Sequence, residues 1–354
     1  MTLTPGEIYF IREKDFFTNT PTDFVKVGLV REKDARTSAD RLSEHQTGNP
    51  RPLYIHHVIR TPAVDRIEAL LHRMFATNRV PGEWFKFNDL ELENVIQTAQ
   101  SLANDAEKTR PLFERADELD KLESNGTTIA TTEIVLAHFL DYHVQDATVK
   151  YLKGLDNQIK AIWRGHIEAG KTIGGAAKIE ARKGKWTFNT SQFKKDHPDL
   201  SAEFSESKDR WYHSFLPKKM DSAEVQGVLE NKVYPIGAEI QQHIEEVQNG
   251  TMNAASLNQD HLILLENIAL AEWEKLIAIA QLKFDCDTND GIEGICAWKR
   301  NFRPIVSLDS IALTEMHPEL AKKYVEFKES KGALKAEGRI AGGQDEQDSD
   351  DEDE

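Results

Sequence analysis

The chain of 354 residues has only two cysteines, Cys286 and Cys296. Two cysteines cannot build a disulfide framework or a four-thiolate zinc site, which excludes both kinds of small stabilised module. The chain also lacks a run of about 18 apolar residues, and its first residues, MTLTPGEIYF, lack a basic segment followed by an apolar one. We therefore expect no membrane span, no secretion and a cytoplasmic location.

Positive charge is scarce on average, because 44 Lys and Arg stand against 60 Asp and Glu, a net charge of −16. Half of this excess lies in residues 341–354, which hold eight acidic residues and no basic one. A like-charged segment cannot bury apolar surface, which predicts a disordered acidic tail over residues 331–354. The tail could act as a solubility device, or as a mimic of nucleic acid that competes for the protein's own basic surface.

Residues 150–195 run against the average, with eleven basic and three acidic residues interleaved with aromatic ones. This pattern is typical of a surface that binds a phosphate backbone, although a solvated helix and hairpin face produces it equally well. For the DNA-binding interpretation, the residues that we predict to contact DNA are Lys171, Lys178, Arg182, Lys183, Lys185, Lys194 and Lys195.

Hydrophobic patterning predicts a small α+β unit over residues 1–89. A helix should begin at Thr37 or Ser38 and end before Gly48, and a second helix should span residues 62–78. Apolar runs predict strands at residues 7–11, 24–30 and 53–59, with a short closing strand at 82–87.

The rest of the chain reads as mainly helical. Residues 90–149 form a predicted helical linker with a break at 124–126, in which Arg110–Pro111 should begin a helix. Residues 150–330 contain a weak duplication, because His197-Pro198-Asp199-Leu200 recurs as His317-Pro318-Glu319-Leu320, 120 positions later. Each copy is predicted to be a long helix, a glycine-marked β-hairpin and a short helix, and two such copies form one domain. The fold class is therefore α+β.

Five residues of the N-terminal unit form a plausible set for phosphodiester hydrolysis. Tyr9 and Lys26 lie on neighbouring strands, Arg41 and His45 share a helix face, and Glu68 lies on the next helix. A carboxylate can hold Mg²⁺, which needs only one or two protein ligands, and Arg41 can stabilise the charge on phosphorus. Tyr9 could act as general base if nearby cations lower its pKa.

The order of these residues resembles that of the GIY-YIG nuclease superfamily over residues 6–87. The sequence segments that carry the resemblance are Gly6-Glu7-Ile8-Tyr9, Lys26-Val27-Gly28, Arg41 to His45, Glu68 and Gly82-Glu83-Trp84-Phe85. The last of these segments resembles that of a phage and bacterial branch of the superfamily. The resemblance implies a three-stranded antiparallel sheet flanked by helices. It also implies one metal ion, Mg²⁺ or Mn²⁺, on Glu68.

By the same resemblance, Tyr9 is the base-side tyrosine, Arg41 stabilises the phosphate, and His45 is the motif histidine. Lys26 takes the place of the second motif tyrosine, as is usual in this branch. Many members have a late asparagine, for which Asn78 and Asn88 are the candidates. Glu83, Trp84 and Phe85 are expected to clamp the core rather than to catalyse.

A second, shorter resemblance links residues 157–327 to helix and hairpin modules of YqaJ-type phage recombination proteins, and it implies a nucleic-acid context. The leading hypothesis is a metal-dependent DNA endonuclease of a phage, mobile element or anti-phage defence system. The alternatives are an inactive nucleic-acid-binding or regulatory protein that keeps the fold, and a scaffold that binds a protein partner or a second copy through residues 90–330.

Overall fold

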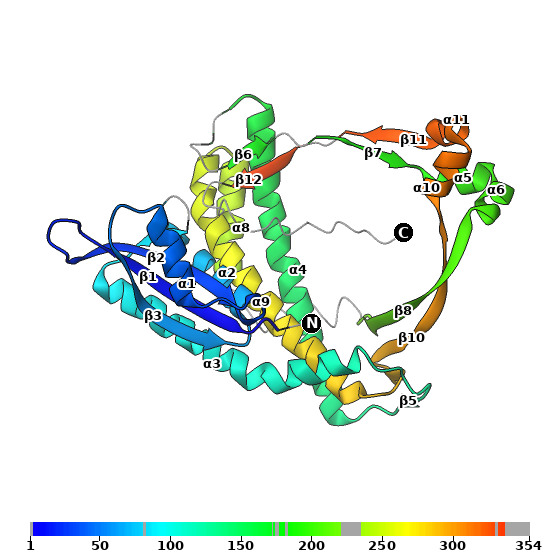
Figure 1. The fold of residues 1–354 in the computed structure, drawn as a ribbon, viewed down its shortest axis with the longest axis horizontal. Coiled ribbons are helices and arrows are strands. Elements are labelled where there is room, and N and C mark those ends of the chain that lie inside the picture. The colour runs from blue at the N-terminus through cyan, green and yellow to red at the C-terminus, as the bar shows by residue number, and fades with distance from the viewer. Residues whose placement is uncertain are drawn as a thin grey trace.

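The computed structural model describes residues 3–80, 83–171, 173, 177–180, 183–220, 235–329 and 332–336. An N-terminal sheet with its helices packs beside three long helices, and a β arch leaves the long helices and returns to them (Figure 1). The predicted α+β class is confirmed, with a mainly helical C-terminal region. Of the predicted disordered tail, residues 331–354, the structure describes residues 332–336, and Ala333–Ala336 form a strand, β12. Arg182 and residues 337–354 lie outside the described residues.

The N-terminal sheet is antiparallel and contains four strands in the order β3-β1-β2-β4. The strands are β1 (Gly6–Lys14), β2 (Pro21–Arg31), β3 (Leu53–Thr61) and β4 (Trp84–Lys86). The resemblance implied three strands, and the short closing strand, β4, adds the fourth by pairing with β2 at the edge.

The two faces of this sheet are covered by different helices. Ile8 and Phe10 of β1 pack in a core with α2 (Val64–Met74) and α3 (Asp89–Leu119), whereas Tyr9 packs on the other face with Leu42 of α1 (Ser38–Thr47). Thr37 caps α1 in a capping box with Asp40, which fixes the start of the helix at the predicted place. Two short 3₁₀ turns, η1 (Glu32–Asp34) and η2 (Ala76–Asn78), complete the unit.

Helix α3 continues the N-terminal core past residue 89. Its buried residues Leu92, Val95 and Ala106 belong to the same cluster as Phe10. The helix runs through Pro111 without ending, so the prediction that a helix begins at Arg110–Pro111 was wrong. Packing on both sides of the proline holds the helix together, because α3 contacts the sheet before Pro111 and α9 after it. The domain boundaries stay predictions.

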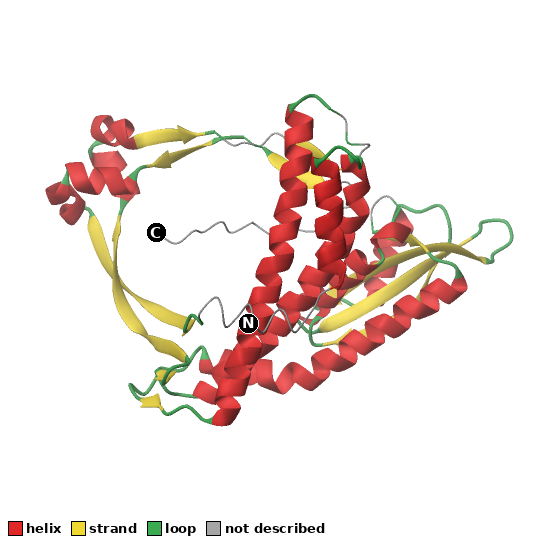
Figure 2. Cartoon of the chain, turned by 180° about the vertical axis from the view of Figure 1, so that it is seen from behind, coloured by secondary structure: helices red, strands yellow, loops and turns green. Residues whose placement is uncertain are grey.

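Three long helices form the second body. They are α4 (Glu133–Glu168), which crosses position 149 unbroken, α8 (Pro235–Gln248) and α9 (Leu257–Cys286), which η3 (Ala254–Ser256) precedes. Their core centres on Trp163, whose indole N–H donates to the carbonyl oxygen of Ala254 at 2.8 Å. Helix α9 also packs against α2 and α3, so it joins the two bodies (Figure 2). None of the described helices is both long and apolar enough to traverse a bilayer.

The duplicated segments form the arch. The first copy contains β6 (Ala177–Glu180), β7 (Lys185–Phe188), α5 (Thr190–Asp196), α6 (Pro198–Glu203) and β8 (Ser205–Pro217). The second contains β9 (Gly291–Ile292), β10 (Cys296–Leu308), α10 (Ser310–Met316), α11 (Pro318–Ala321), η4 (Lys322–Tyr324), β11 (Val325–Lys328) and β12 (Ala333–Ala336). The copies match locally, since His197 has φ −133° and ψ 62° and His317 has φ −130° and ψ 57°.

The strands of one copy pair with the strands of the other. β6 pairs with β12, β7 with β11 and β8 with β10, all antiparallel. The predicted hairpin within the first copy was therefore wrong, because its strands satisfy their hydrogen bonds in the second copy. The second copy keeps a tight turn between β9 and β10, and β5 (Thr128–Ile129) adds to β9 in parallel.

Candidate active site

Two motif glycines are required by close approaches of the chain. Gly28 lies opposite Tyr9 in the β1–β2 ladder, and a Cβ at position 28 would lie 2.4 Å from the tyrosine Oη. A Cβ at Gly6 would lie 2.1 Å from the carbonyl oxygen of Val30. The glycines of the two motifs therefore let the Tyr9 ring lie flat across β2 and let β1 and β2 pair tightly.

Tyr9, Arg41 and His45 form one group on the α1 side of the sheet. The Tyr9 hydroxyl lies 3.1 Å from Nε2 of His45, and Arg41 hydrogen-bonds to the same hydroxyl. Burial raises the pKa of Tyr9 above its usual value and outweighs the opposing effect of Arg41. The sequence hypothesis required nearby cations to lower the pKa of Tyr9 below its usual value, and the effect of Arg41 is too small to do so.

His45 is neutral at neutral pH. Burial lowers its pKa to about 4, and the positive charges of Lys26 and Arg41 add to the shift. A neutral imidazole has one nitrogen that accepts a hydrogen bond, so Nε2 can accept from the Tyr9 hydroxyl in one tautomer. Arg41 also forms an ion pair with Glu44 at 2.6 Å, which orients its guanidinium.

Lys26 lies on the Tyr9 face of the sheet and forms a buried ion pair with Glu83. Its side chain is 9% exposed, whereas that of Glu83 is 32% exposed. The sequence predicts that residues 83–85 clamp the core, and Trp84 and Phe85 do pack on the two faces of the sheet. Sequence reasoning missed Glu83 as a site residue. The signal for it was an acidic residue directly before the short closing strand, β4, whose first residue lies opposite Lys26.

Glu68 on α2 has an unusual protonation equilibrium. Burial raises its pKa to about 7, and the negative charges of Glu83 and Asp65 contribute. His72, one turn further on, lies 3.8 Å from Glu68, and its Nε2 lies 3.0 Å from the carbonyl oxygen of Val27. Burial lowers the pKa of His72 to about 4, so it is neutral and in the tautomer with Nε2–H donates to that carbonyl.

The carboxylate of Glu68 suits a hard cation whose other ligands come from water and from the substrate. Among the described residues, no group of three or more His, Cys, Asp or Glu side chains is arranged to hold a metal ion. Glu68 is 20% exposed, and a cation there would replace the proton that its raised pKa favours. Mg²⁺ usually takes one or two carboxylates and completes its shell with water and phosphate, so Glu68 fits it.

The two candidates for a late asparagine have structural roles. Asn78 donates through Nδ2 to the carbonyl oxygen of Lys86 at 3.3 Å. Asn88 caps α3 in a capping box with Glu91. From this part of the chain, Glu83 reaches the site through its contact with Lys26.

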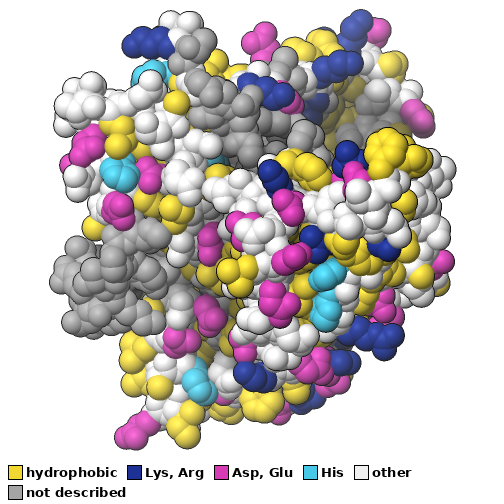
Figure 3. Space-filling view, turned by 90° about the vertical axis from the view of Figure 1, so that its left-hand side faces the viewer, with side chains coloured by type: hydrophobic (Ala, Val, Ile, Leu, Met, Phe, Trp, Pro, Cys, Tyr) yellow, Lys and Arg dark blue, Asp and Glu magenta, His cyan; other side chains and the backbone are white. Residues whose placement is uncertain are grey.

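The predicted DNA-binding lysines are exposed but spread along the arch. Lys171 follows α4, Lys178 lies on β6 and pairs with Glu180 at 3.2 Å, and Lys194 lies in the last turn of α5. The remaining described members are Lys183, Lys185 and Lys195, all exposed. They do not form one compact patch. On the face of the molecule shown in Figure 3, Lys and Arg side chains lie among Asp and Glu side chains.

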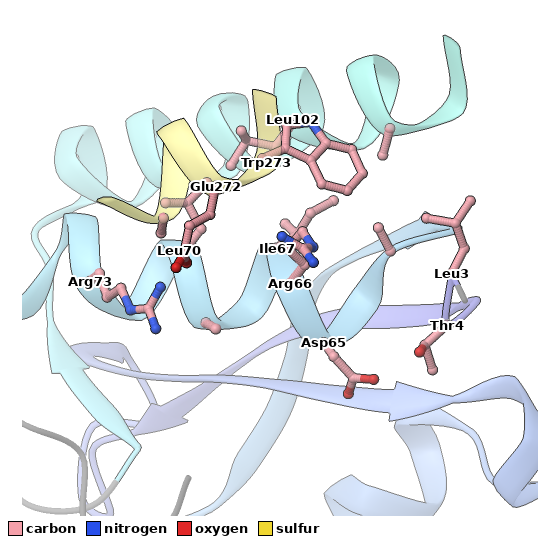
Figure 4. A pocket seen from close by; sticks show the side chains of 14 residues that line it. Leu3, Thr4, Asp65, Arg66, Ile67, Leu70, Arg73, Leu102, Glu272 and Trp273 are labelled. Atoms are coloured by element: carbon pink, nitrogen blue, oxygen red, sulfur yellow. The ribbon is translucent and has the colours of Figure 1, made fainter. Parts of the chain in front are cut away.

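A separate cavity lies between α2, α3 and α9 and has a volume of about 280 Å³ (Figure 4). Arg66 covers the ring of Trp273 there, with its guanidinium 5.0 Å from the ring centroid. None of the five predicted site residues lines this cavity. The candidate chemistry is therefore on another side of α2.

Comparison with known proteins gives one match. The model of the T5orf172 domain matches residues 6–102, and this family is associated with phage nucleases of the GIY-YIG and HNH-like kinds. The match ends within α3, which agrees with the packing of that helix on the sheet. No curated protein and no solved structure matches the chain. A phage-type nuclease or DNA-binding function is therefore suggested for the N-terminal unit.

Proposed function

We propose that this protein is a DNA endonuclease of the GIY-YIG type that hydrolyses phosphodiester bonds with Mg²⁺ or Mn²⁺ held by Glu68. One observation carries the proposal: the side chains of the predicted set interact electrostatically across four elements. Arg41 and His45 hydrogen-bond to Tyr9. The positive charge of Lys26 acts to lower the pKa of both His45 and Glu68. The T5orf172 match supports a phage, mobile-element or anti-phage defence context.

The protein's own residues would move the proton and stabilise charge. The Tyr9 hydroxyl takes a proton from the attacking water as it donates its own proton to Nε2 of His45, so prior ionisation of Tyr9 is not needed. Arg41 stabilises the negative charge that develops on the phosphate. A divalent ion on Glu68 would neutralise phosphate charge and orient the leaving oxygen.

A plasmid nicking assay tests the proposal. We expect wild-type protein to nick supercoiled DNA with Mg²⁺ or Mn²⁺ and to lose activity in EDTA. Glu68→Ala and Arg41→Ala should each lower the rate by roughly 100-fold or more, whereas the control Glu107→Ala, on the exposed surface of α3, should not. Equal cleavage by all four proteins would rule out this active site.

The runner-up is a DNA-binding or regulatory protein that keeps the fold without catalysis. It predicts DNA binding in EDTA and no nicking with either metal. The scaffold hypothesis predicts no affinity for DNA under any of these conditions. Binding and nicking measured on the same preparation therefore separate the three.

A further inference from the structure

The longest strand pair of the arch is a two-stranded ribbon with two unlike faces. β8 and β10 pair over 13 residues, from Cys296 opposite Pro217 to Leu308 opposite Ser205. The ribbon curves away from the long helices and carries the short helices at its far end (Figures 1 and 2). Side chains alternate along each strand, and residues opposite one another share a face.

One face of the ribbon is aromatic and anchors it. Trp298 is buried, and its ring contacts Phe215, which lies opposite, at 5.6 Å. Phe302 and Trp211 form a second aromatic cross-strand pair, at 5.1 Å, and the buried Arg300 lies opposite His213 between the two aromatic pairs. We call the end of the ribbon where Cys296 lies opposite Pro217 its root. Near this root, the aromatic face joins the core formed by α4, α9 and β9.

The other face of the ribbon is basic. Its cations, in order from the root, are Lys299, Arg303, Arg210 and Lys208. The Arg303 guanidinium stacks on the Tyr212 ring at 3.8 Å, and its Nε donates to Oδ1 of Asn301 at 3.0 Å. Tyr212 and Asn301 lie opposite each other on this same face, so Arg303 is held in a fixed orientation. We call these six side chains the basic ribbon face.

Acidic residues neutralise the basic ribbon face at Lys208 but not at its two arginines. Glu206 lies on this face and pairs with Lys208 at 2.5 Å. The negative charge of Asp309, the residue after β10, also attracts Lys208. Asp309 accepts hydrogen bonds from two backbone N–H groups of α10. Arg210 and Arg303 form no ion pair with any residue that the structure describes.

Arg210 lies directly opposite Arg303 in the ladder. Like charges at opposite positions destabilise a strand pair, so this arrangement favours an anion that binds across both guanidiniums. The cations extend from Lys299 to the level of Ile305, opposite Lys208, a length of about 20 Å at about 3.4 Å per residue. That length covers about six base pairs of a duplex at about 3.4 Å each.

We propose that the basic ribbon face binds duplex DNA in the major groove. The groove admits a two-stranded β-ribbon, Arg is the usual partner of guanine O6 and N7, and Asn can recognise adenine. The inference rests on the proposed function, because the DNA held by the ribbon is the substrate of the N-terminal unit. It does not use the lysines predicted from the sequence.

Binding is tested with the Glu68→Ala protein, which keeps DNA intact, by fluorescence anisotropy on a 30-base-pair duplex over a salt series. For Arg210→Ala/Arg303→Ala we expect affinity to fall about 10- to 100-fold, and the salt slope to decrease by about 1 for each of the two arginines whose charge also neutralises a phosphate. The matched control is Lys108→Ala/Lys121→Ala on α3, whose lysines are exposed and pair locally. The control should bind as the parent does.

A conservative variant and a chemical probe separate charge from groove recognition. Arg210→Lys/Arg303→Lys should restore the salt slope but not protection of guanine N7, a major-groove atom, from dimethyl sulfate. Bound parent protein should protect guanines within a window of about six base pairs. Unprotected guanines with normal affinity would overturn the major-groove assignment, and unchanged affinity of the alanine pair would overturn the ribbon proposal.

Each result also keeps the two proposals apart. If wild-type protein nicks DNA and the ribbon variants bind and nick equally well, the ribbon proposal fails and the nuclease stands. If the ribbon variants lose binding but no variant or wild type cleaves, the ribbon proposal stands and the nuclease fails. Tighter binding to single strands than to duplex, with no N7 protection, overturns the ribbon proposal in favour of a single-strand site.

Discussion

The ring of Tyr9 lies across Gly28 so closely that position 28 has no room for a side chain, since a Cβ would meet Oη at 2.4 Å and Cζ at 2.5 Å. Gly28, in the second motif, thus leaves the space that Tyr9, in the first motif, occupies. The same hydroxyl bonds to His45 and Arg41, so the space at Gly28 sets the position of the whole group.

Gly28→Ala should therefore damage stability and activity together. We expect the free energy of unfolding in urea to fall by about 1–3 kcal/mol, because a methyl group overfills a packed site. Nicking should fall more than 10-fold as Tyr9 moves. The control is Gly48→Ala, where a Cβ meets nothing within 4 Å and which should change neither measurement by much. A fully active Gly28→Ala protein would contradict the role of Tyr9.

In the ion pair between Lys26 and Glu83, removing Glu83 should destabilise the protein more than removing Lys26. Glu83→Ala leaves the buried ammonium of Lys26 without its partner, at a cost of about 3–5 kcal/mol. Lys26→Met leaves the more exposed carboxylate of Glu83, so it should cost less. The double variant Lys26→Met/Glu83→Ala should be more stable than Glu83→Ala alone. Urea unfolding of the wild type and the three variants gives the coupling energy, and additive losses would show that the pair is not coupled.

The stabilising effect of Mg²⁺ should depend on pH through Glu68. The pKa of Glu68 is raised from 4.5 to about 7, so between these values the native state binds more protons than the unfolded state and stability falls as pH rises. His72 acts in the opposite direction below pH 6.5, because its pKa is lowered to about 4. A metal replaces the proton on Glu68 without competition only above pH 7.

Thermal unfolding with and without Mg²⁺ at pH 6 and pH 8 measures this effect. The increase in Tm on adding the metal should be larger at pH 8, and at ten times Kd it corresponds to about 1.4 kcal/mol. Glu68→Gln should remove the increase at both values. A pH-independent increase that survives in Glu68→Gln would place the metal elsewhere.

The basic segment predicted from the sequence can be compared with the ribbon. If Lys183 and Lys185 hold the backbone of DNA, Lys183→Glu/Lys185→Glu should weaken binding and flatten its salt dependence. If the ribbon alone holds DNA, this pair should have a much smaller effect than Arg210→Glu/Arg303→Glu. Anisotropy titrations of both variants at three salt concentrations decide between the two surfaces.

The acidic tail gives a prediction from charge alone. Deleting residues 341–354 removes eight negative charges. If the tail competes with DNA for basic surface, deletion should strengthen binding several-fold at low salt, and the gain should vanish at high salt. Unchanged affinity with poorer solubility would identify the tail as a solubility device.

The sequence by itself determined the local structure of the N-terminal unit. Apolar runs placed β1, β2 and β3, and the Thr37 cap placed the start of α1, because these signals act over a few residues. The order of Tyr9, Lys26, Arg41, His45 and Glu68 identified the candidate site, and the structure brings these residues into one interacting set.

Only the tertiary structure decided what depends on distant partners. Glu83 meets Lys26 from 57 positions away, and Arg210 faces Arg303 across a ladder that joins the two repeat copies. Such contacts depend on which strand satisfies which backbone groups, and a local pattern does not specify this. For the same reason β7 reads as half of a hairpin in the sequence but pairs with β11, and α3 passes Pro111 because α9 packs against its far half.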